Sequence, residues 1–447
     1  MKIKSLNNYH IILLASISSI LFYLRFTKSL NAVPDIGKYD SNSYFKFNLF
    51  GGLRMPIITL IYDVIENPVK ITIFQTTISA ISLFILSLSL FLLKFKKDLI
   101  LVTGLLIVVL GNSSQIIYLD SSMDSESLNL TAINFLLSSI IILFNTSSSR
   151  FAKVYFFICL IFFVGIKTMN NVISIFILTY LVLFKNYLLI SKKRKIFSYT
   201  VIIVIMSLNL TYFTNTKITP ELNTSAIINS RLWEVPKWRE FILKNHFPVE
   251  ARSIFVRFES RNLGEPPDAA VGDLKQFKNW YTEKGGNNFL LKFMISHPSY
   301  TFFGPIAFPL LTQRLTLDET IWRGAAVGRL DYETFTSANY QFLNLDFIFW
   351  PLDRSNAYFY LAIMIFVIGI GQIVRFLYKD YILELDLIVF LVFLFFSISY
   401  FAWWFGSTPS DLGRQQFAFA YGIRIVYILN LLIISELILR KSVRRIN

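Results

Sequence analysis

Apolar stretches close to the length of a membrane-spanning helix recur from one end of the sequence to the other. A bilayer core of about 30 Å requires roughly 20 mostly apolar residues per helix. Hydrophobic residues make up 54% of the chain and charged residues only 16%, whereas an ordinary soluble domain carries about a quarter charged residues. The sequence therefore predicts an all-α polytopic membrane protein.

Ten segments satisfy this requirement closely enough to be predicted as transmembrane helices. They are Tyr9–Leu24, Ile71–Leu93, Leu99–Leu119, Leu128–Phe144, Phe151–Ile166, Val172–Ile190, Phe197–Phe213, Ala357–Val374, Leu387–Ala402 and Phe417–Leu439. Several of them contain Asn, Ser and Thr, which suits helices that face other helices or a watery crevice more than lipid.

The ten helices divide the chain into three parts. Residues 1–213 form an N-terminal membrane module of seven helices, with a long first external loop at 25–70. Residues 214–356 form an external loop domain, and residues 357–447 hold the last three helices. Within the loop domain, the segment 289–312 is apolar but interrupted by prolines. We expect this segment to lie on or dip into the membrane rather than to cross it.

The formal net charge of +15 raises the question of nucleic-acid binding, but the distribution of the cations argues against it. Lys and Arg gather in short runs between apolar segments, at Lys94–Lys97, Ser191–Lys195 and Arg440–Arg445. Cytoplasmic loops of multi-pass membrane proteins have this enrichment. With ten helices, all these clusters lie in the cytoplasm when both termini do. We therefore expect no nucleic-acid partner.

The chain lacks the residue patterns of a structural or catalytic metal site. It has one cysteine, Cys159, inside an apolar run, and three histidines, His10, His246 and His297, that are far apart in the sequence. Neither residue type occurs at metal-binding spacing, so no histidine or cysteine metal site is predicted. Cys159 is expected to be a small buried apolar residue.

An unusual polar stretch, YDSNSYFKFNLFGGLRMP, follows the first apolar segment. It contains Asp40, Tyr44, a glycine pair and Arg54 just before a proline. This run in a first external loop resembles the GT-C superfamily of membrane glycosyltransferases, which take a sugar from a polyprenyl-phosphate carrier. The resemblance implies that Asp40 is the catalytic base, with Tyr44 and Arg54 as substrate-binding residues. Asp35 is a rival for the base, although it lacks the surrounding motif.

An inverting sugar transfer requires a carboxylate near the acceptor hydroxyl, which takes its proton as the sugar carbon is attacked. The phosphate leaving group departs as an anion that nearby cations stabilise, so no strong general acid is needed. Glu126, in the run DSSMDSESLNL, resembles the acid of the second external loop in the same superfamily and is the second catalytic candidate. Asp and Ser here also suit a helix N-terminus.

Three further cations are candidates for binding the carrier phosphate. Arg414 precedes the last apolar segment and Arg424 lies well inside it, where a charged side chain indicates a functional role. The partner expected for Arg424 is a lipid phosphate, Asp411 or Glu126. Lys167, in GIKTMNNVIS, matches a superfamily position that often holds a cation. The planar donors of arginine suit phosphate.

We therefore predict a GT-C-type glycosyltransferase that acts on the outer, periplasmic face of a bacterial cytoplasmic membrane. Its donor is a polyprenyl-phosphate sugar and its acceptor a glycan, a lipid or a protein, with membrane lipid as its surroundings. No firm cofactor is predicted. Asp120, Asp124 and Glu126 are candidates for a divalent cation, although their spacing matches no calcium loop.

Two other functions compete with this one. An O-antigen-type polymerase or ligase also has about a dozen helices and a large arginine-containing outer loop. The arginines of this loop domain are Arg231, Arg239, Arg252, Arg257 and Arg261. The non-enzymatic alternative is a lipid or solute transporter, which would place polar groups on broken helices at mid-membrane.

The distribution of cations gives a first testable prediction. A single cysteine at Gly272, in the external domain, is expected to react with a membrane-impermeant thiol reagent added to whole cells, because the domain is predicted outside. A cysteine at Lys193 is expected to react only after the membrane is opened, since it lies in a basic cytoplasmic cluster. Reaction at Lys193 alone in intact cells would contradict this topology.

Overall fold

The computed structural model describes residues 8–31, 47, 55–121, 125–146, 149–167, 169–184, 224, 227–228, 232–233, 235–249, 275–301, 349, 354–378, 386, 388–389, 391 and 412–446. Every regular element in these ranges is helical, as predicted. Five helices are long and apolar enough to cross a membrane: Asn8–Leu30, Pro68–Leu92, Glu126–Asn145, Phe359–Phe376 and Ala418–Leu439. The predicted span 197–213 and most of 387–402 lie outside the described residues, so the total of ten stays a prediction.

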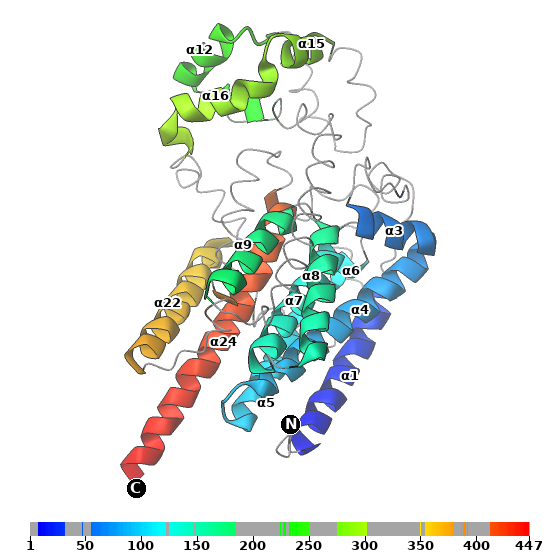
Figure 1. Cartoon of the computed structure of the whole chain (residues 1–447), viewed down its shortest axis with the longest axis vertical. Helices are drawn as coiled ribbons and strands as arrows, with labels where there is room; N and C mark the ends of the chain where they lie inside the picture. Colours follow the sequence, from blue (N-terminus) through cyan, green and yellow to red (C-terminus); the bar gives the residue numbers. More distant parts are fainter. Residues whose placement is uncertain are drawn as a thin grey trace.

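The helices pack as a bundle with a smaller group of helices beyond one end (Figure 1). The bundle contains α1 (Asn8–Asn31), α3 (Pro56–Ile65), α4 (Pro68–Ser89), η1 (Leu90–Leu92), α5 (Lys97–Gly111), α6 (Ser114–Asp120), α7 (Glu126–Asn145), α8 (Arg150–Ile166), α9 (Met169–Phe184), α22 (Arg354–Tyr378) and α24 (Leu412–Ile446). The smaller group contains α12 (Pro236–Lys244), α15 (Lys275–Glu283), η4 (Gly286–Asn288) and α16 (Phe289–Ser296).

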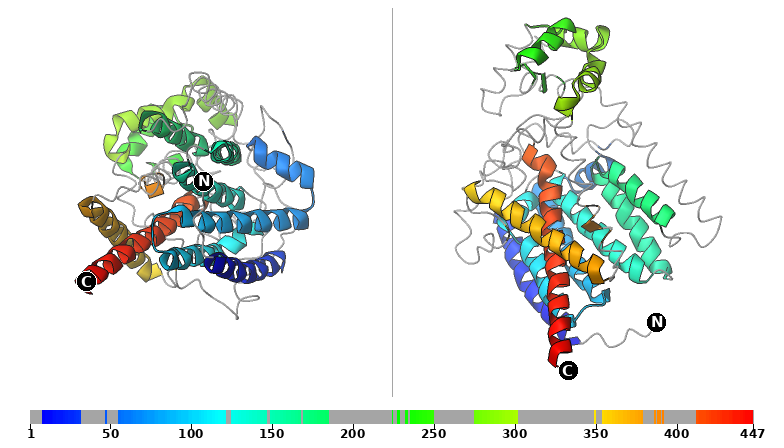
Figure 2. Two further views of the ribbon diagram at one scale, coloured as in Figure 1. Left: turned by 60° about the horizontal axis from the view of Figure 1, so that its bottom comes forward. Right: turned by 90° about the vertical axis from the view of Figure 1, so that its left-hand side faces the viewer.

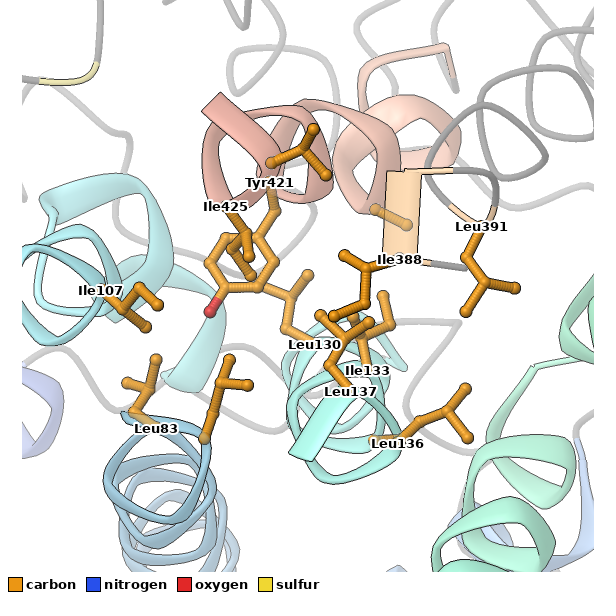
Figure 3. Close-up of a cluster of buried hydrophobic side chains, with 14 of the residues drawn as sticks. Leu83, Ile107, Leu130, Ile133, Leu136, Leu137, Ile388, Leu391, Tyr421 and Ile425 are labelled. Atoms are coloured by element: carbon orange, nitrogen blue, oxygen red, sulfur yellow. The ribbon is translucent and has the colours of Figure 1, made fainter. Parts of the chain in front are cut away.

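Helix α7 is the centre of the bundle. Of its apolar stretch 83% is buried, against 22% for α1 and for α22. It packs against α4, α8 and α24. Figure 3 shows how leucine and isoleucine side chains of α7, among them Leu130 and Leu137, meet Leu83 of α4 and Ile425 of α24. Helices α1 and α22 therefore lie at the edge of the bundle, where an apolar face is left for lipid.

Both ends of the described chain lie at the same end of the bundle, opposite α12, α15 and α16 (Figure 1). Two contacts define this end. His10 Nε2 lies 2.7 Å from Asp98 Oδ1, which joins the start of α1 to the start of α5. The backbone N–H of Lys96 donates to Glu436 Oε2 at 2.9 Å, which joins α5 to the last turns of α24. The arrangement agrees with the predicted common side of the two termini; the side of the membrane stays a prediction.

Two predicted boundaries are wrong. The predicted span Leu99–Leu119 is divided at Asn112 and Ser113 into α5 and the short α6. The first helix does not end at Leu24 but continues to Asn31. The reason for both differences is Arg25. Its side chain is buried and donates to the carbonyl of Gly111, where α5 ends.

The smaller group of helices has an aromatic core of its own. Trp238, Phe277, Trp280, Phe289 and Phe293 are buried in it. Trp280 Nε1 donates to the backbone carbonyl of residue 245 at 2.8 Å, so the indole N–H is satisfied. The predicted interfacial segment 289–312 begins in this core. Its described part contains α16, which has 8 residues and is too short to span a membrane.

Helices α22 and α24 pack against each other (Figure 2). A Cβ atom at Gly371 would collide with Asn430 of α24, whose Oδ1 accepts a 2.9 Å hydrogen bond from Gln372. A Cβ atom at Gly369, on the same helix, would meet nothing.

This difference predicts the effect of a matched pair of substitutions. Gly371→Leu is expected to force α22 from α24 and to destabilise the protein by about 1–3 kcal/mol, the usual effect of overpacking. Gly369→Leu should leave stability nearly unchanged. Thermal unfolding of both variants in the same detergent tests the comparison, and equal melting temperatures would contradict the close contact.

Candidate functional site

A buried ion pair joins α1 to the end of α6. Arg25 Nε lies 2.7 Å from Asp120 Oδ2, and both side chains are almost fully inaccessible to solvent. The other two nitrogens of Arg25 donate to the Gly111 carbonyl at 2.7 Å and to Ser79 Oγ at 2.6 Å. The guanidinium thus bonds to groups from three neighbouring elements. A buried charge is tolerable only when it is paired and hydrogen-bonded in this way.

A second ion pair lies at the start of α7, next to the first. Ser127 Oγ donates to Asp120 Oδ1 at 2.7 Å, and its neighbour Glu126 accepts from Lys167 Nζ at 3.1 Å. Glu126 is buried, whereas the Lys167 side chain keeps 14% of its accessible surface. Lys167 terminates α8 in an extended conformation. The structure therefore brings together two residues that the sequence resemblance assigned to one site.

Two amide side chains next to the Glu126–Lys167 pair, one on α7 and one on α9, extend this polar region. Asn170 Nδ2 donates to Asn129 Oδ1 at 2.8 Å and to the Phe163 carbonyl at 2.7 Å. Asn129 lies one turn after Glu126 on α7. The two amides thereby fix the start of α9 against α7, and they hold the backbone on both sides of Lys167.

A third set of hydrogen bonds links α24 to the same network. The Tyr421 hydroxyl donates to Asn134 Oδ1 at 2.8 Å, and Asn134 Nδ2 donates to Ser82 Oγ at 3.2 Å. Ser82 Oγ in turn donates to the carbonyl of Ser79. The side-chain hydroxyl of Ser79 accepts a hydrogen bond from Arg25. Figure 3 shows the Tyr421 ring among the apolar side chains between α24, α5 and α7. Polar contacts therefore run from α24 through α7 and α4 to α1.

Arg424 lies three residues further along α24 and is 1% exposed. Its Nε donates to the carbonyl of Phe349 at 2.9 Å, and its Nη1 donates to the carbonyl of Ala420 at 2.6 Å. The partners predicted from the sequence were a lipid phosphate, Asp411 or Glu126. Carbonyl oxygens carry no net charge, so these two hydrogen bonds do not neutralise the guanidinium.

The first-loop candidates cannot be placed. Asp40, Tyr44 and Arg54 lie outside the described residues, as does the rival base Asp35. For Arg414 the structure describes the backbone, in the first turn of α24, and not the side chain. The roles of these five candidate residues stay predictions.

The ends that flank the first loop are described, and both lie near the paired residues. Arg25, which meets Asp120 beside Ser127, is in the last two turns of α1. At the other end, Ile57 in the first turn of α3 packs so tightly on Gly165 of α8 that a Cβ atom at Gly165 would collide with it. Gly165 is two residues from Lys167.

The acids of the second loop do not gather as a metal site in the described part of the chain. No group of three His, Cys, Asp or Glu side chains suits a metal ion there. Asp120 accepts from Arg25 and Ser127, and Glu126 accepts from Lys167 and from Ser125 at 3.1 Å. Asp124, the remaining candidate ligand, lies outside the described residues.

Sequence reasoning missed the Arg25–Asp120 pair, which is the most buried charged contact of the site. The predicted first external loop begins at residue 25, and Asp120 is predicted only as a candidate cation ligand with Asp124 and Glu126. A signal existed: Phe26 and Leu30 continue the apolar residues at helical spacing beyond Arg25. A charge inside an apolar helix indicates a buried partner.

Comparisons of the chain with protein-family models, with curated proteins and with solved structures find no match. The resemblance to a glycosyltransferase superfamily therefore depends on the short sequence motifs alone.

The buried ion pair gives a prediction for stability. Asp120→Asn leaves the Arg25 charge buried without its counter-charge, and we expect a loss of about 3–5 kcal/mol. The double variant Arg25→Met, Asp120→Leu should recover part of this loss, because it buries no charge. Asp98→Asn is the control: it removes a carboxylate that is 90% exposed, and we expect a change within about 1 kcal/mol.

Thermal unfolding in detergent measures all three variants. If Asp120→Asn and Asp98→Asn were equally stable, the Arg25–Asp120 contact would not be the buried pair described above.

Proposed function

We propose that this chain is an inverting glycosyltransferase of the GT-C type, which uses a polyprenyl-phosphate sugar at the outer face of a bacterial cytoplasmic membrane. The observation that carries the proposal is the Glu126–Lys167 pair. These two residues are 41 positions apart in the sequence, and the motif resemblance assigns both of them to the site. The pair lies toward the end of the bundle that is opposite the termini.

The anchoring of the first loop supports the same site. Arg54 is three residues before Ile57, so the backbone between them spans at most about 11 Å. Ile57 packs on Gly165, close to Lys167. Asp40 is nine residues after Asn31 and has a reach of about 30 Å from the end of α1. The helices at the two ends of the loop thus contact residues next to the candidate site, Asp120 through Arg25 and Gly165 through Ile57.

In the proposed reaction the Asp40 carboxylate accepts the proton of an acceptor hydroxyl. The acceptor oxygen forms a bond to the sugar carbon as the bond from that carbon to the carrier phosphate breaks. The electron pair of the broken bond leaves with the phosphate, whose negative charge is stabilised by Arg54, Arg414 and Arg424. Tyr44 contacts the substrate. Any divalent cation would have to be held by acids outside the Arg25–Asp120 pair.

The contact between Lys167 and Glu126 gives the second acid a defined role. A phosphate that approaches Lys167 competes with the Glu126 carboxylate for the ammonium group. Arrival of the carrier therefore frees Glu126 to bind a sugar or acceptor hydroxyl. Glu126 is thus paired with Lys167 in the empty site and with a hydroxyl group of the ligand in the occupied site. A buried carboxylate without a hydrogen-bond partner is unfavourable, and this exchange avoids that state.

One observation favours a transporter as the second candidate. The helix that was predicted as one span is interrupted between α5 and α6, and a charged side chain binds the carbonyl at the break. Transporters use such discontinuous helices at their binding sites. In this chain, however, Arg25 is already paired with Asp120. Uptake or release of substrate by vesicles without any sugar transfer would favour this candidate.

The catalytic test uses a matched pair of aspartates. Asp40→Asn keeps the size of the side chain but removes the base, and transfer from polyprenyl-phosphate sugars should fall by about 10²–10⁴-fold, the usual contribution of a general base. Carrier binding should change little. Asp35→Asn, five residues away in the same loop, should be nearly fully active. Arg424→Ala should instead weaken carrier binding, with a smaller loss at saturating donor.

The outcomes separate the possible sites. Full activity in Asp40→Asn together with loss in Asp35→Asn would move the base to Asp35. Full activity in both variants would remove the first loop from the chemistry and leave Glu126→Gln as the variant to test. Absence of transfer in the unmodified protein, over a panel of polyprenyl-phosphate sugars and acceptors, would count against the proposed function.

A further inference from the structure

One face of α7 holds the junction between α8 and α9 through two contacts. Glu126 Oε1 accepts from Lys167 Nζ at 3.1 Å. Asn129 Oδ1, one turn later on α7, accepts from Asn170 Nδ2 at 2.8 Å. Asn129 and Asn170 are 2% and 0% exposed, whereas the Lys167 side chain keeps 14% of its accessible surface. The charged contact is therefore the more accessible of the two, and the amide contact is the more buried.

Asn170 also bonds to the chain on both sides of the Lys167 side chain. Helix α8 ends at Ile166 and α9 begins at Met169, so Lys167 is the first residue of a two-residue link. The backbone N–H of Asn170 donates to the Lys167 carbonyl at 3.0 Å. Its side-chain Nδ2 donates to the carbonyl of Phe163 at 2.7 Å. This carbonyl is one of the last four of α8, which have no partner within their own helix. Asn170 thus fixes both the last turn of α8 and the link.

The Lys167 side chain cannot determine its own position. Its ammonium group is at the end of a flexible four-carbon stem, so its place depends on the backbone and on its partner. A phosphate that takes the ammonium group from Glu126 removes the ionic contact between α7 and the link. The amide contact between Asn129 and Asn170 is neutral and buried, so it stays when the ionic contact is lost.

We propose that Asn170 is a positioning residue, which together with Asn129 holds the backbone of Lys167 while its ammonium group exchanges between Glu126 and a carrier phosphate. The inference rests on the proposed function for the identity of the phosphate. It has a consequence that a merely structural amide does not share: Asn170 affects phosphate affinity only through Lys167.

A double-mutant cycle on the full chain in detergent tests this consequence. The readout is equilibrium binding of a short-chain polyprenyl monophosphate, which requires no sugar transfer. Lys167→Met should weaken binding by about tenfold or more, since it removes a charge-assisted hydrogen bond. Asn170→Leu keeps the size of the side chain but removes its donors, and it should weaken binding about threefold to tenfold. In the Lys167→Met background the same change should have an effect of less than about twofold.

A second measurement needs no carrier at all. An amine-reactive imidoester is added to the protein without ligand, and its reaction at Lys167 is quantified by peptide mass spectrometry. Asn170→Leu should raise the rate of this reaction about threefold or more, because a link that is no longer held opens more often. Asn129→Leu leaves the bond to Phe163 in place and should act in the same direction with a smaller effect. It provides the readout if Asn170→Leu does not fold.

Ser138→Ala is the matched control. Ser138 Oγ lies 3.0 Å from the Tyr155 hydroxyl, so it is a buried polar contact between α7 and α8 that is remote in sequence from Lys167. This variant should change neither binding nor labelling. Unchanged labelling of Lys167 in the Asn170 and Asn129 variants would overturn the inference. Equal losses of affinity from Asn170→Leu in both backgrounds would also overturn it, because the amide would then act independently of Lys167. Coupled binding and raised labelling without any sugar transfer would support the positioning role and count against the proposed transferase.

Discussion

The Arg25–Asp120 ion pair is the contact on which the arrangement of the bundle depends. A buried guanidinium must be neutralised and fully hydrogen-bonded. Each of these two requirements corresponds to a feature of the fold. The chain interrupts its third apolar segment so that the Gly111 carbonyl is free to accept. At the end of α6, Asp120 also accepts a hydrogen bond from Ser127, at the start of α7. The helix that holds Arg25 can then continue to Asn31.

The same requirement explains why the most buried helix is also rich in polar residues. Helix α7 holds Glu126, Ser127, Asn129 and Asn134, all of them buried. Each forms a hydrogen bond or an ion pair with a different helix, so the polar groups determine which helices surround α7. In a membrane, apolar packing alone discriminates weakly between neighbours, because lipid is as apolar as leucine. Hydrogen bonds and ion pairs are directional, so they determine which helices pack against α7.

The sequence predicted most of the helices and only part of the site, for a physical reason. Hydropathy over about 20 residues is a local property, and it located α1, α4, α7, α22 and α24. The break after Gly111 depends on a side chain 86 residues earlier, and no local pattern reports that contact. Lys167 and Glu126 were selected by motif and were found in contact. Arg424 was correctly expected inside the last helix, although its described partners are carbonyls.

The position of the paired charges relates the fold to the proposed chemistry. The loop that contains Asp40 is fixed at one end by the helix of Arg25 and at the other by the packing of Ile57 on Gly165. A base on a loop can approach a substrate only if the ends of that loop are held, because fixing the ends limits the conformations that must be lost on binding. In the proposed reaction, Arg25 and Asp120 would act as positioning residues. They hold the start of α7, and with it Glu126, at the place where the loop begins.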